Sequence, residues 1–333
     1  MSKVFELWNK VGGAFGPSGR ENAVCEVIAG IAGEYVDDIE TDALGNLICR
    51  KKGSGKKLLF AAHMDTIGLV VTYIDEKGFI RFSPVGGLFK GDLINITVRF
   101  ENGTRGVLSY EEKTPFKDLT LDNLFVDIGA ADREEAEKQV QIGDFAVFDA
   151  PRFEQNGVIC GPYLDNRIGC VTLLMMMEQL SGVETESDLY FVFTTQEEVG
   201  LRGAGAAAFA VEPDTAIAVD VTDTGDLPER KTPMAVDMGK GPAIKVMDRS
   251  VICTPAVCAA LGQAAADCSI TVQREILTAG GTDTAALQKA RAGAQAGAVS
   301  IPTRYIHSPS EMCAASDVMD AAKLLARFAA QQR

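Results

Sequence analysis

The chain has 333 residues, of which 47% are hydrophobic and 23% are charged, and its formal net charge is −14. This composition is typical of a globular protein, and no apolar run approaches the ~20 residues that a membrane-spanning helix needs. A nucleic-acid-binding protein usually carries a basic patch or a high pI, which this acidic sequence lacks. The stretch MSKVFELWNK at the N-terminus lacks the apolar core of a signal peptide, so we expect a cytoplasmic protein.

Eight cysteines are present, and none forms a C-x-x-C pair. Most lie in apolar contexts such as GCVTLL, which is typical of buried free thiols in a reducing compartment. Cys160 and Cys170 flank Asp165, but no further histidine is at hand to activate a thiol. We therefore do not expect a nucleophilic cysteine.

The first 157 residues change character at about position 69. Two helices are expected within residues 2–35, followed by strands at 35–41, 46–50 and 58–62, the last being the apolar run LLFAA. From 69 to 157, short runs rich in Val, Ile and Phe alternate with Gly and charged turns, with one helical piece at 132–138. This pattern predicts a small β-barrel-like domain that is inserted into a larger domain made of residues 1–68 and 158–333.

Strands and helices alternate again after Gly161. Strands are expected at 189–195, 216–221 and 298–302, and helices at 165–180, 204–210, 251–267, 284–291 and 314–331. Such alternation indicates an α/β sheet covered by helices on both faces. The predicted fold class is therefore a three-layer αβα domain with an inserted β-rich domain.

Polar side chains that are able to bind metal ions follow the predicted strands. In open α/β sheets, ligands bind beyond the carboxyl ends of the strands. Two histidines, which are all that the chain contains, and five acidic residues occupy five such segments: His63 and Asp65, Asp165, Glu197 and Glu198, Asp220, and His307.

The tripeptide His63-Met64-Asp65 ends one of these strands. Residues two apart in an extended chain point to the same side, so His63 and Asp65 face one centre. A carboxylate beside a ligating imidazole orients it and raises its basicity. A core histidine that is bonded to its neighbouring aspartate is the alternative.

The adjacent Glu197 and Glu198 diverge, so we expect one to ligate a metal ion and the other to accept a proton from water. An acidic pair at a helix start is the alternative. Asp165 is also compatible with a helix N-cap, and Asp220 with a turn. Because two further aspartates follow at 223 and 226, only its place at the end of an apolar strand favours Asp220.

Taken together, two histidines, three further acidic ligands and a spare glutamate suit two adjacent divalent ions that one carboxylate bridges. Nitrogen and carboxylate ligands favour Zn²⁺, with Co²⁺ or Mn²⁺ as alternatives.

The sequence resembles the M42 family of metallo-aminopeptidases, which includes the self-compartmentalising tetrahedral (TET) peptidases. The motifs that carry the resemblance span nearly the whole chain in the family's order: AAHMDTIG (61–68), LDNRIGC (164–170), TTQEEVGLRGA (194–204), AVD (218–220), GGTD (280–283) and IPTRYIHSPSE (301–311).

The resemblance implies a role for each matching position. It implies that two divalent metal ions are bound by His63, Asp165, Glu198, Asp220 and His307, with Asp165 as the bridge. It further implies that Glu197 is the general base and that Asp65 orients His63. The implied fold is a phosphorylase/hydrolase-like α/β domain with an inserted assembly domain.

One departure concerns that inserted domain. Family members often carry a histidine there after a glycine-lysine stretch, whereas residues 106–116 read GVLSYEEKTPF. That histidine is not a metal ligand. We therefore expect a homo-oligomer, with a dimer better supported than a dodecamer.

The expected activity is removal of the N-terminal residue from peptides with a free N-terminus, with neither nucleic acid nor membrane as a partner. Two alternatives stay open: a glycosidase that uses a carboxylate pair, and a non-catalytic metal-dependent assembly protein. The preferred N-terminal side chain is not determined. Lys245 and Arg249 could select an acidic one, although surface or structural roles are commoner for such residues.

Overall fold

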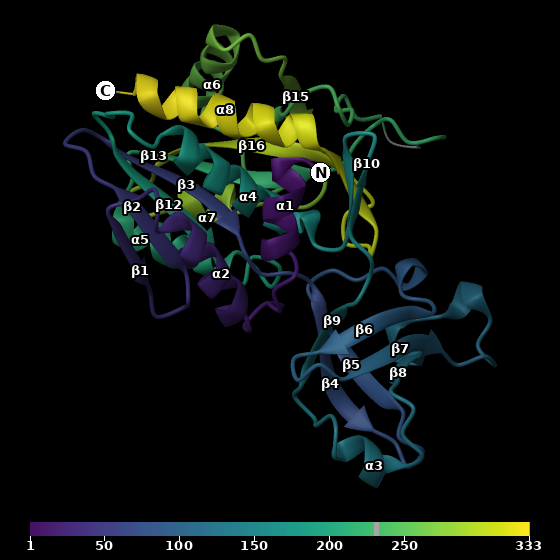
Figure 1. Cartoon of the computed structure of the whole chain (residues 1–333). Helices are drawn as coiled ribbons and strands as arrows, with labels where there is room; N and C mark the ends of the chain where they lie inside the picture. The colour runs from purple at the N-terminus through teal and green to yellow at the C-terminus, as the bar shows by residue number, and fades with distance from the viewer. Residues whose placement is uncertain (230–232, 333) are drawn as a thin grey trace.

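The computed structural model describes residues 1–229 and 233–332, which form a large α/β lobe and a smaller β-barrel lobe (Figure 1). The last residue of the predicted large domain, 333, lies outside the described part. No helix among the described residues is both long and apolar enough to cross a bilayer. The fold class agrees with the prediction of an α/β domain that carries an inserted β-barrel.

The large lobe is built on an 11-stranded mixed sheet. Nine strands follow one another across it in the order β1 (Asp38–Thr41), β2 (Leu47–Lys51), β12 (Asp188–Thr194), β3 (Lys57–His63), β13 (Thr215–Thr222), β16 (Gln295–Arg304), β17 (Glu311–Ala314), β11 (Val158–Gly161) and β10 (Phe153–Gln155). A branch adds β14 (Ala243–Met247), which pairs with β16, and β15 (Gln273–Ile276). The neighbours β12, β3, β13 and β16 run parallel, so their carboxyl ends lie at one edge.

Helices cover both faces of this sheet. One face packs against α1 (Lys3–Val11), α2 (Asn22–Ala32), α4 (Leu164–Gln179), α6 (Pro255–Asp267) and α8 (Ala315–Gln331), and the other against α5 (Arg202–Val211) and α7 (Thr284–Gln288).

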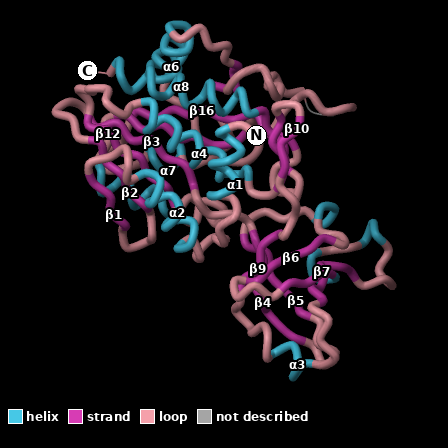
Figure 2. The backbone as a smooth tube through the Cα atoms, viewed as in Figure 1, coloured by secondary structure: helices cyan, strands magenta, loops and turns pink. Residues whose placement is uncertain are grey.

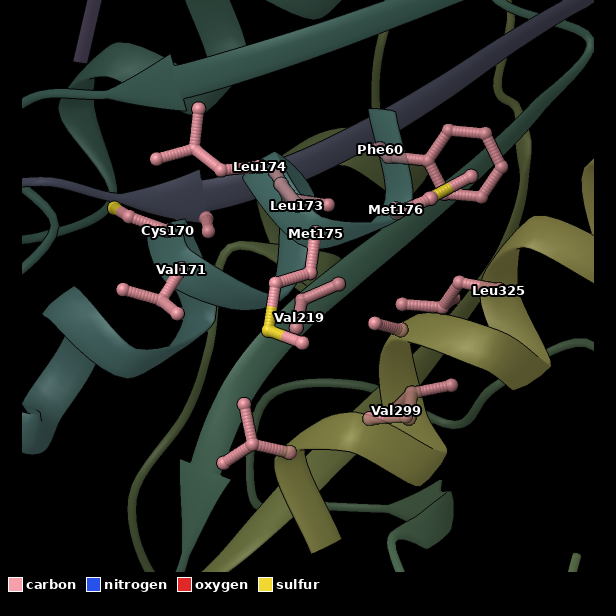
Figure 3. Packing of buried hydrophobic residues seen from close by; sticks show 14 of the residues in the cluster. Phe60, Cys170, Val171, Leu173, Leu174, Met175, Met176, Val219, Val299 and Leu325 are labelled. Carbon is pink, nitrogen blue, oxygen red and sulfur yellow. The ribbon is translucent and has the colours of Figure 1, made fainter. Parts of the chain in front are cut away.

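The side chains of β3 show why both faces are buried. Leu58 and Phe60 join the cluster beneath α4 and α8, while Leu59 and Ala61 join the one beneath α5 and α7. Figure 3 shows the first layer, with Val219 of the sheet near side chains of α4 and α8. A strand that is buried on both faces has no polar alternation, which is why LLFAA reads as a continuous apolar run.

The inserted lobe is a closed barrel in which the strands follow the order β4 (Gly68–Ile74), β5 (Ile80–Val85), β8 (Leu124–Asp127), β7 (Arg105–Tyr110), β6 (Ile96–Phe100) and β9 (Phe145–Phe148). Short helices α3 (Arg133–Glu137), η1 (Lys90–Asp92), η2 (Phe116–Asp118) and η3 (Leu121–Asn123) connect the strands (Figure 2). The inserted domain was predicted to end at residue 157, but the last barrel strand, β9, ends at Phe148. The strand that follows, β10, pairs with β11 in the large sheet.

Other differences from the predicted elements lie in the second half of the chain. Short strands β14, β15 and β17 were not predicted, because four or five residues carry little periodic signal. The helix expected from 251 begins instead at Pro255. Proline is preferred in the first helical turn, and the preceding Ile252 forms a bridge with Met247.

Two glycines of α5 occupy contrasting positions. A Cβ at Gly203 would lie 2.1 Å from Asn46 Oδ1 and 2.6 Å from the backbone of Thr195, at the end of β12. A Cβ at Gly205 would meet nothing within 4 Å. The start of α5 therefore depends on a side chain that is no larger than hydrogen.

We expect Gly203→Ala to lower the free energy of unfolding by about 1–3 kcal/mol or more, because an overpacked contact must move backbone. The matched variant Gly205→Ala should raise it by up to ~1 kcal/mol through helix propensity. Denaturant unfolding of both variants measures the difference. Equal stabilities would contradict the close approach at Gly203.

Candidate metal centre

The predicted site residues lie together at the carboxyl edge of the parallel strands. His63 ends β3, Asp220 lies in β13, and Glu197 and Glu198 follow β12. His307 follows β16, and Asp165 opens α4. All six line one cavity of about 750 Å³.

The Asp165 carboxylate lies between the two histidines. Its Oδ1 is 3.1 Å from His63 Nε2, and its Oδ2 is 3.2 Å from His307 Nε2. A carboxylate that presents one oxygen to each of two imidazoles has the arrangement expected of a bridging ligand.

Each histidine has a second carboxylate beside it. His63 Nε2 lies 3.7 Å from Asp220 Oδ1, and His307 Nε2 lies 3.4 Å from Glu198 Oε2. Asp220 and Glu198 are therefore on opposite sides of Asp165, next to different imidazoles.

The turn after β12 makes the two adjacent glutamates diverge. Gln196 has a left-handed backbone with φ of 54°, which is uncommon outside glycine and is often found at functional sites. Beyond it, Glu198 faces His307, while Glu197 Oε2 lies 3.9 Å from His63 Nε2.

Asp65 is wholly buried and holds this turn in place. Its carboxylate accepts hydrogen bonds from the backbone N–H groups of Glu197 (3.0 Å) and Glu198 (3.2 Å), and from the Ser18 hydroxyl (2.6 Å). Its Oδ1 also lies 3.4 Å from His63 Nδ1, the ring nitrogen that faces away from Asp165. Asp65 thus contacts both the first histidine and the glutamate pair.

The buried charges are unbalanced. Burial raises the pKa of Glu197 and of Asp220 well above the usual range, although His63 opposes both shifts. Burial would lower the pKa of His63, but Glu197, with the bonds to Asp165 and Asp65, raises it well above its usual range. Each of these shifts reports an excess of buried carboxylate, which a divalent cation would neutralise.

The donor atoms fit metal ions. Within the described residues, three groups of side chains place their ligand atoms within 4.8 Å of one another, and all three belong to this site. Two of them share Asp165: one adds His63 and Asp220, and the other adds Glu198 and His307. In addition, Glu198 Oε1 is buried without a hydrogen-bond partner among the described residues, as expected for an oxygen that binds a cation.

Glu311 is a site residue that the sequence interpretation did not assign, although it ends the quoted motif IPTRYIHSPSE. Its two carboxylate oxygens accept the backbone N–H groups of Asp165 and His307, both at 2.9 Å. His307 has a left-handed backbone, with φ of 67°, and the bond from its N–H helps to hold it there. Glu311 therefore positions two candidate ligands at once.

Asp283, in the motif GGTD, was also left without a role. It is buried behind the site, and burial raises its pKa to about 6. Its Oδ2 accepts a hydrogen bond from the hydroxyl of Thr194, the last residue of β12. It thereby ties the GGTD loop to the strand that carries the glutamate pair.

Sequence spacing alone did not distinguish the aspartates at 220, 223 and 226, but their surroundings in the structure differ. Asp220 lies beside His63, whereas Asp226 pairs with Arg304 through both oxygens. Asp223 lines the cavity but belongs to none of the three candidate metal groups. The strand-end position therefore selected the aspartate that lies beside His63, and its role as a ligand stays a prediction.

Neither cysteine near Asp165 has the environment of a nucleophile. Burial raises the pKa of Cys170 to about 12, and its Sγ donates a hydrogen bond to the backbone carbonyl of His63. Burial also raises the pKa of Cys160. Neither thiol therefore has the lowered pKa that activates a nucleophilic cysteine.

The barrel lobe supplies one wall of the cavity. A Cβ at Gly86 would lie 3.1 Å from Glu198 Cβ, and one at Gly87 would lie 3.0 Å from His307 Nδ1. Phe89, which is 61% exposed, lines the same cavity, and its ring centroid is 6.4 Å from that of His307. The loop after β5 therefore packs directly on two candidate ligands.

Comparisons with known proteins show the family to which the chain belongs. The model of the M42 glutamyl aminopeptidase family matches residues 45–324. A protein of Acetivibrio thermocellus that is named as an aminopeptidase is 50% identical over 323 residues, which covers 97% of each chain.

Two archaeal structures have the same fold. Aminopeptidase APDkam598 of Desulfurococcus kamchatkensis superposes with a TM-score of 0.95 at 36% identity, covering 99% of this chain and 95% of that one. The TET1 peptidase of Pyrococcus horikoshii, which can assemble into a tetrahedron or a large octahedral shell, has a TM-score of 0.89 at 33% identity, covering 99% and 100%. The chain therefore belongs to the M42 aminopeptidase family and is a peptidase.

Proposed function

We propose that this aminopeptidase uses two divalent metal ions to remove the N-terminal residue of peptides, with Glu197 as its general base. The observation that carries this proposal is Asp165, whose two oxygens face two histidines. A single-ion site would not need this symmetric arrangement.

The donor set suggests how two ions are held. His63 and Asp220 would bind one ion, Glu198 and His307 would bind the other, and Asp165 would contribute to both. We favour Zn²⁺ because nitrogen and carboxylate ligands suit it, with Co²⁺ or Mn²⁺ as alternatives. When bound, such ions polarise a scissile carbonyl and lower the pKa of water.

Glu197 has the properties of a proton carrier. Its carboxylate lines the cavity and belongs to neither group that shares Asp165, so it remains available to substrate. We assign its Oε2, which lies on the side of His63, to take a proton from the attacking water and pass it to the nitrogen of the leaving amine.

Asp65 and Glu311 are assigned as positioning residues. Asp65 fixes the backbone of both glutamates, and Glu311 fixes that of Asp165 and His307. Rigid support of this kind keeps catalytic groups within the narrow tolerances that efficient catalysis needs. Family membership favours peptides over the glycosides and the purely structural role that the sequence alone left open.

We further propose that the protein is a cytoplasmic homo-oligomer. The P. horikoshii relative assembles into closed shells, and the whole chain superposes on it, inserted barrel included. All eight cysteines are free, which supports a reducing compartment. We assign the barrel, residues 68–148, to assembly as well as to the wall of the cavity.

Chelation is the first test. We expect enzyme that has been stripped of metal to lose at least ~99% of its activity on an alanyl anilide, and added Zn²⁺ or Co²⁺ to restore it. Circular dichroism controls for unfolding, and elemental analysis gives the ions bound per subunit. Full activity in a sample shown to be metal-free would refute the metal mechanism.

Substitution of the proposed base is the second test. Glu197→Gln should bind the same number of ions as the wild type but lower kcat by about 10²–10⁴-fold, because general-base catalysis contributes that much. Glu212→Gln, at an exposed glutamate that follows α5, is the control and should leave kcat unchanged. A Glu197→Gln enzyme with normal turnover would remove this residue from the mechanism.

Mass measurement tests assembly. We expect light scattering to give at least a dimer, or twice the 35.5 kDa of one chain, and a dodecamer if the assembly of the PhTET1-12s structure is shared. A monomer at micromolar concentration would contradict the assigned role of the barrel in assembly.

A further inference from the structure

We infer, on the basis of the proposed activity, that this enzyme prefers peptides that begin with an uncharged aliphatic residue such as leucine. The inference concerns the part of the cavity that lies beyond the candidate metal ligands. Its walls decide which side chain can follow the substrate amine into the site.

Those walls are mainly apolar. Four segments that follow different strands contribute partly buried aliphatic side chains: Leu201 before α5, Leu227 after β13, Leu277 after β15 and Ile306 after β16. Phe89 of the barrel loop and Ala279 add further apolar surface. An aliphatic side chain placed there would lose contact with water and gain contacts on several sides, which favours its binding.

Neither of the two basic residues that could have selected an acidic side chain lines the cavity. Lys245 is completely buried, where its Nζ bonds to Glu275 and lies 3.4 Å from Asp248. Arg249 is not among the residues that line the cavity, and neither is any other lysine or arginine of the described part of the chain.

This buried ion cluster instead supports an apolar wall. Asp248 accepts a hydrogen bond from the hydroxyl of Thr282, and Thr282 lies in the loop that begins at Leu277. Lys245 therefore interacts with Asp248, which in turn holds the loop through Thr282. The aliphatic side chain that this loop contributes to the cavity wall is Leu277.

A charged N-terminal side chain would meet a poor environment. An acidic one would be buried among aliphatic side chains and near Asp223, with no lysine or arginine beside it among the described lining residues. A basic one could approach Asp223, which accepts the backbone N–H of Thr224, but would bury its charge among leucines. Aliphatic side chains avoid both costs.

Four aminoacyl anilides test the inference: leucyl, alanyl, glutamyl and lysyl, each assayed with enzyme supplied with Zn²⁺ or Co²⁺. We expect kcat/KM for the leucyl substrate to exceed that for the alanyl one at least ~10-fold, because each added methylene in an apolar pocket is worth about 10-fold or more. The glutamyl and lysyl substrates should fall below the alanyl one.

The panel separates this inference from the proposed function. Metal-dependent cleavage of the alanyl substrate together with equal or faster cleavage of the glutamyl or lysyl one would overturn the aliphatic preference and leave the aminopeptidase mechanism standing. Failure to cleave any of the four with bound metal would overturn both.

Leu277→Lys tests the wall directly, with its neighbour as the control. The variant should lower leucyl kcat/KM at least ~10-fold and raise the glutamyl-to-leucyl ratio by the same factor, because a cation now faces the cavity. Ile276→Lys places the same charge one residue away, at a 56% exposed position outside the cavity lining, and should change neither value by more than about twofold.

Leu277→Ala is a second variant that introduces no charge and so tests the same wall if the lysine variant does not fold. It should reduce the leucyl-to-alanyl preference at least ~5-fold, because it removes apolar contacts from the pocket. Unchanged preference in a folded Leu277 variant would show that this side chain does not contact the substrate and would overturn the assignment.

Discussion

The position of the Asp165 carboxylate between His63 and His307 is the contact on which the site depends. The two histidines lie 244 residues apart in the sequence, and the Asp165 carboxylate contacts both of them. Several buried groups are arranged around that contact. Glu311 accepts the backbone N–H of both Asp165 and His307, so one side chain fixes the bridge and one of its partners. Asp65 likewise contacts the ring of His63 and accepts hydrogen bonds from the backbone N–H groups of the glutamate pair.

Such a concentration of buried carboxylates is unfavourable for folding unless something compensates it. Desolvation is the largest cause of the raised pKa of the Glu197, Asp220 and Glu311 carboxyl groups, and neighbouring carboxylates raise it further. Cations at this point would supply the compensation, which links the stability of the site to its chemistry. The charged groups are held by hydrogen bonds to Asp65 and Glu311, and the rest of the cavity wall is mainly apolar. The same cavity therefore combines a strongly polar end with an aliphatic one.

Much of the fold could be predicted because the long elements carry strong patterns. The parallel strands β3, β12, β13 and β16 are largely apolar, and the polar residues at their carboxyl ends had to meet at one edge. Shorter strands were missed because three to five residues are too few to show a periodic pattern. The residues of β10 were placed in the inserted domain because the local sequence of a strand does not specify its pairing partner. Glu311 and Asp283 were missed as site residues because their roles consist of hydrogen bonds to distant backbone and side-chain groups.

By itself, the sequence determined the candidate ligands, because the chain has only two histidines and each follows an apolar strand in a motif of the M42 family. It also determined that a β-rich segment interrupts an α/β domain. The tertiary structure alone decided which oxygen of Asp165 faces which histidine, that Lys245 is buried away from the cavity, and that a barrel loop closes one side of it. The physical reason is that residue type and local pattern are properties of a segment, whereas distance, burial and charge balance arise only when distant segments pack against one another.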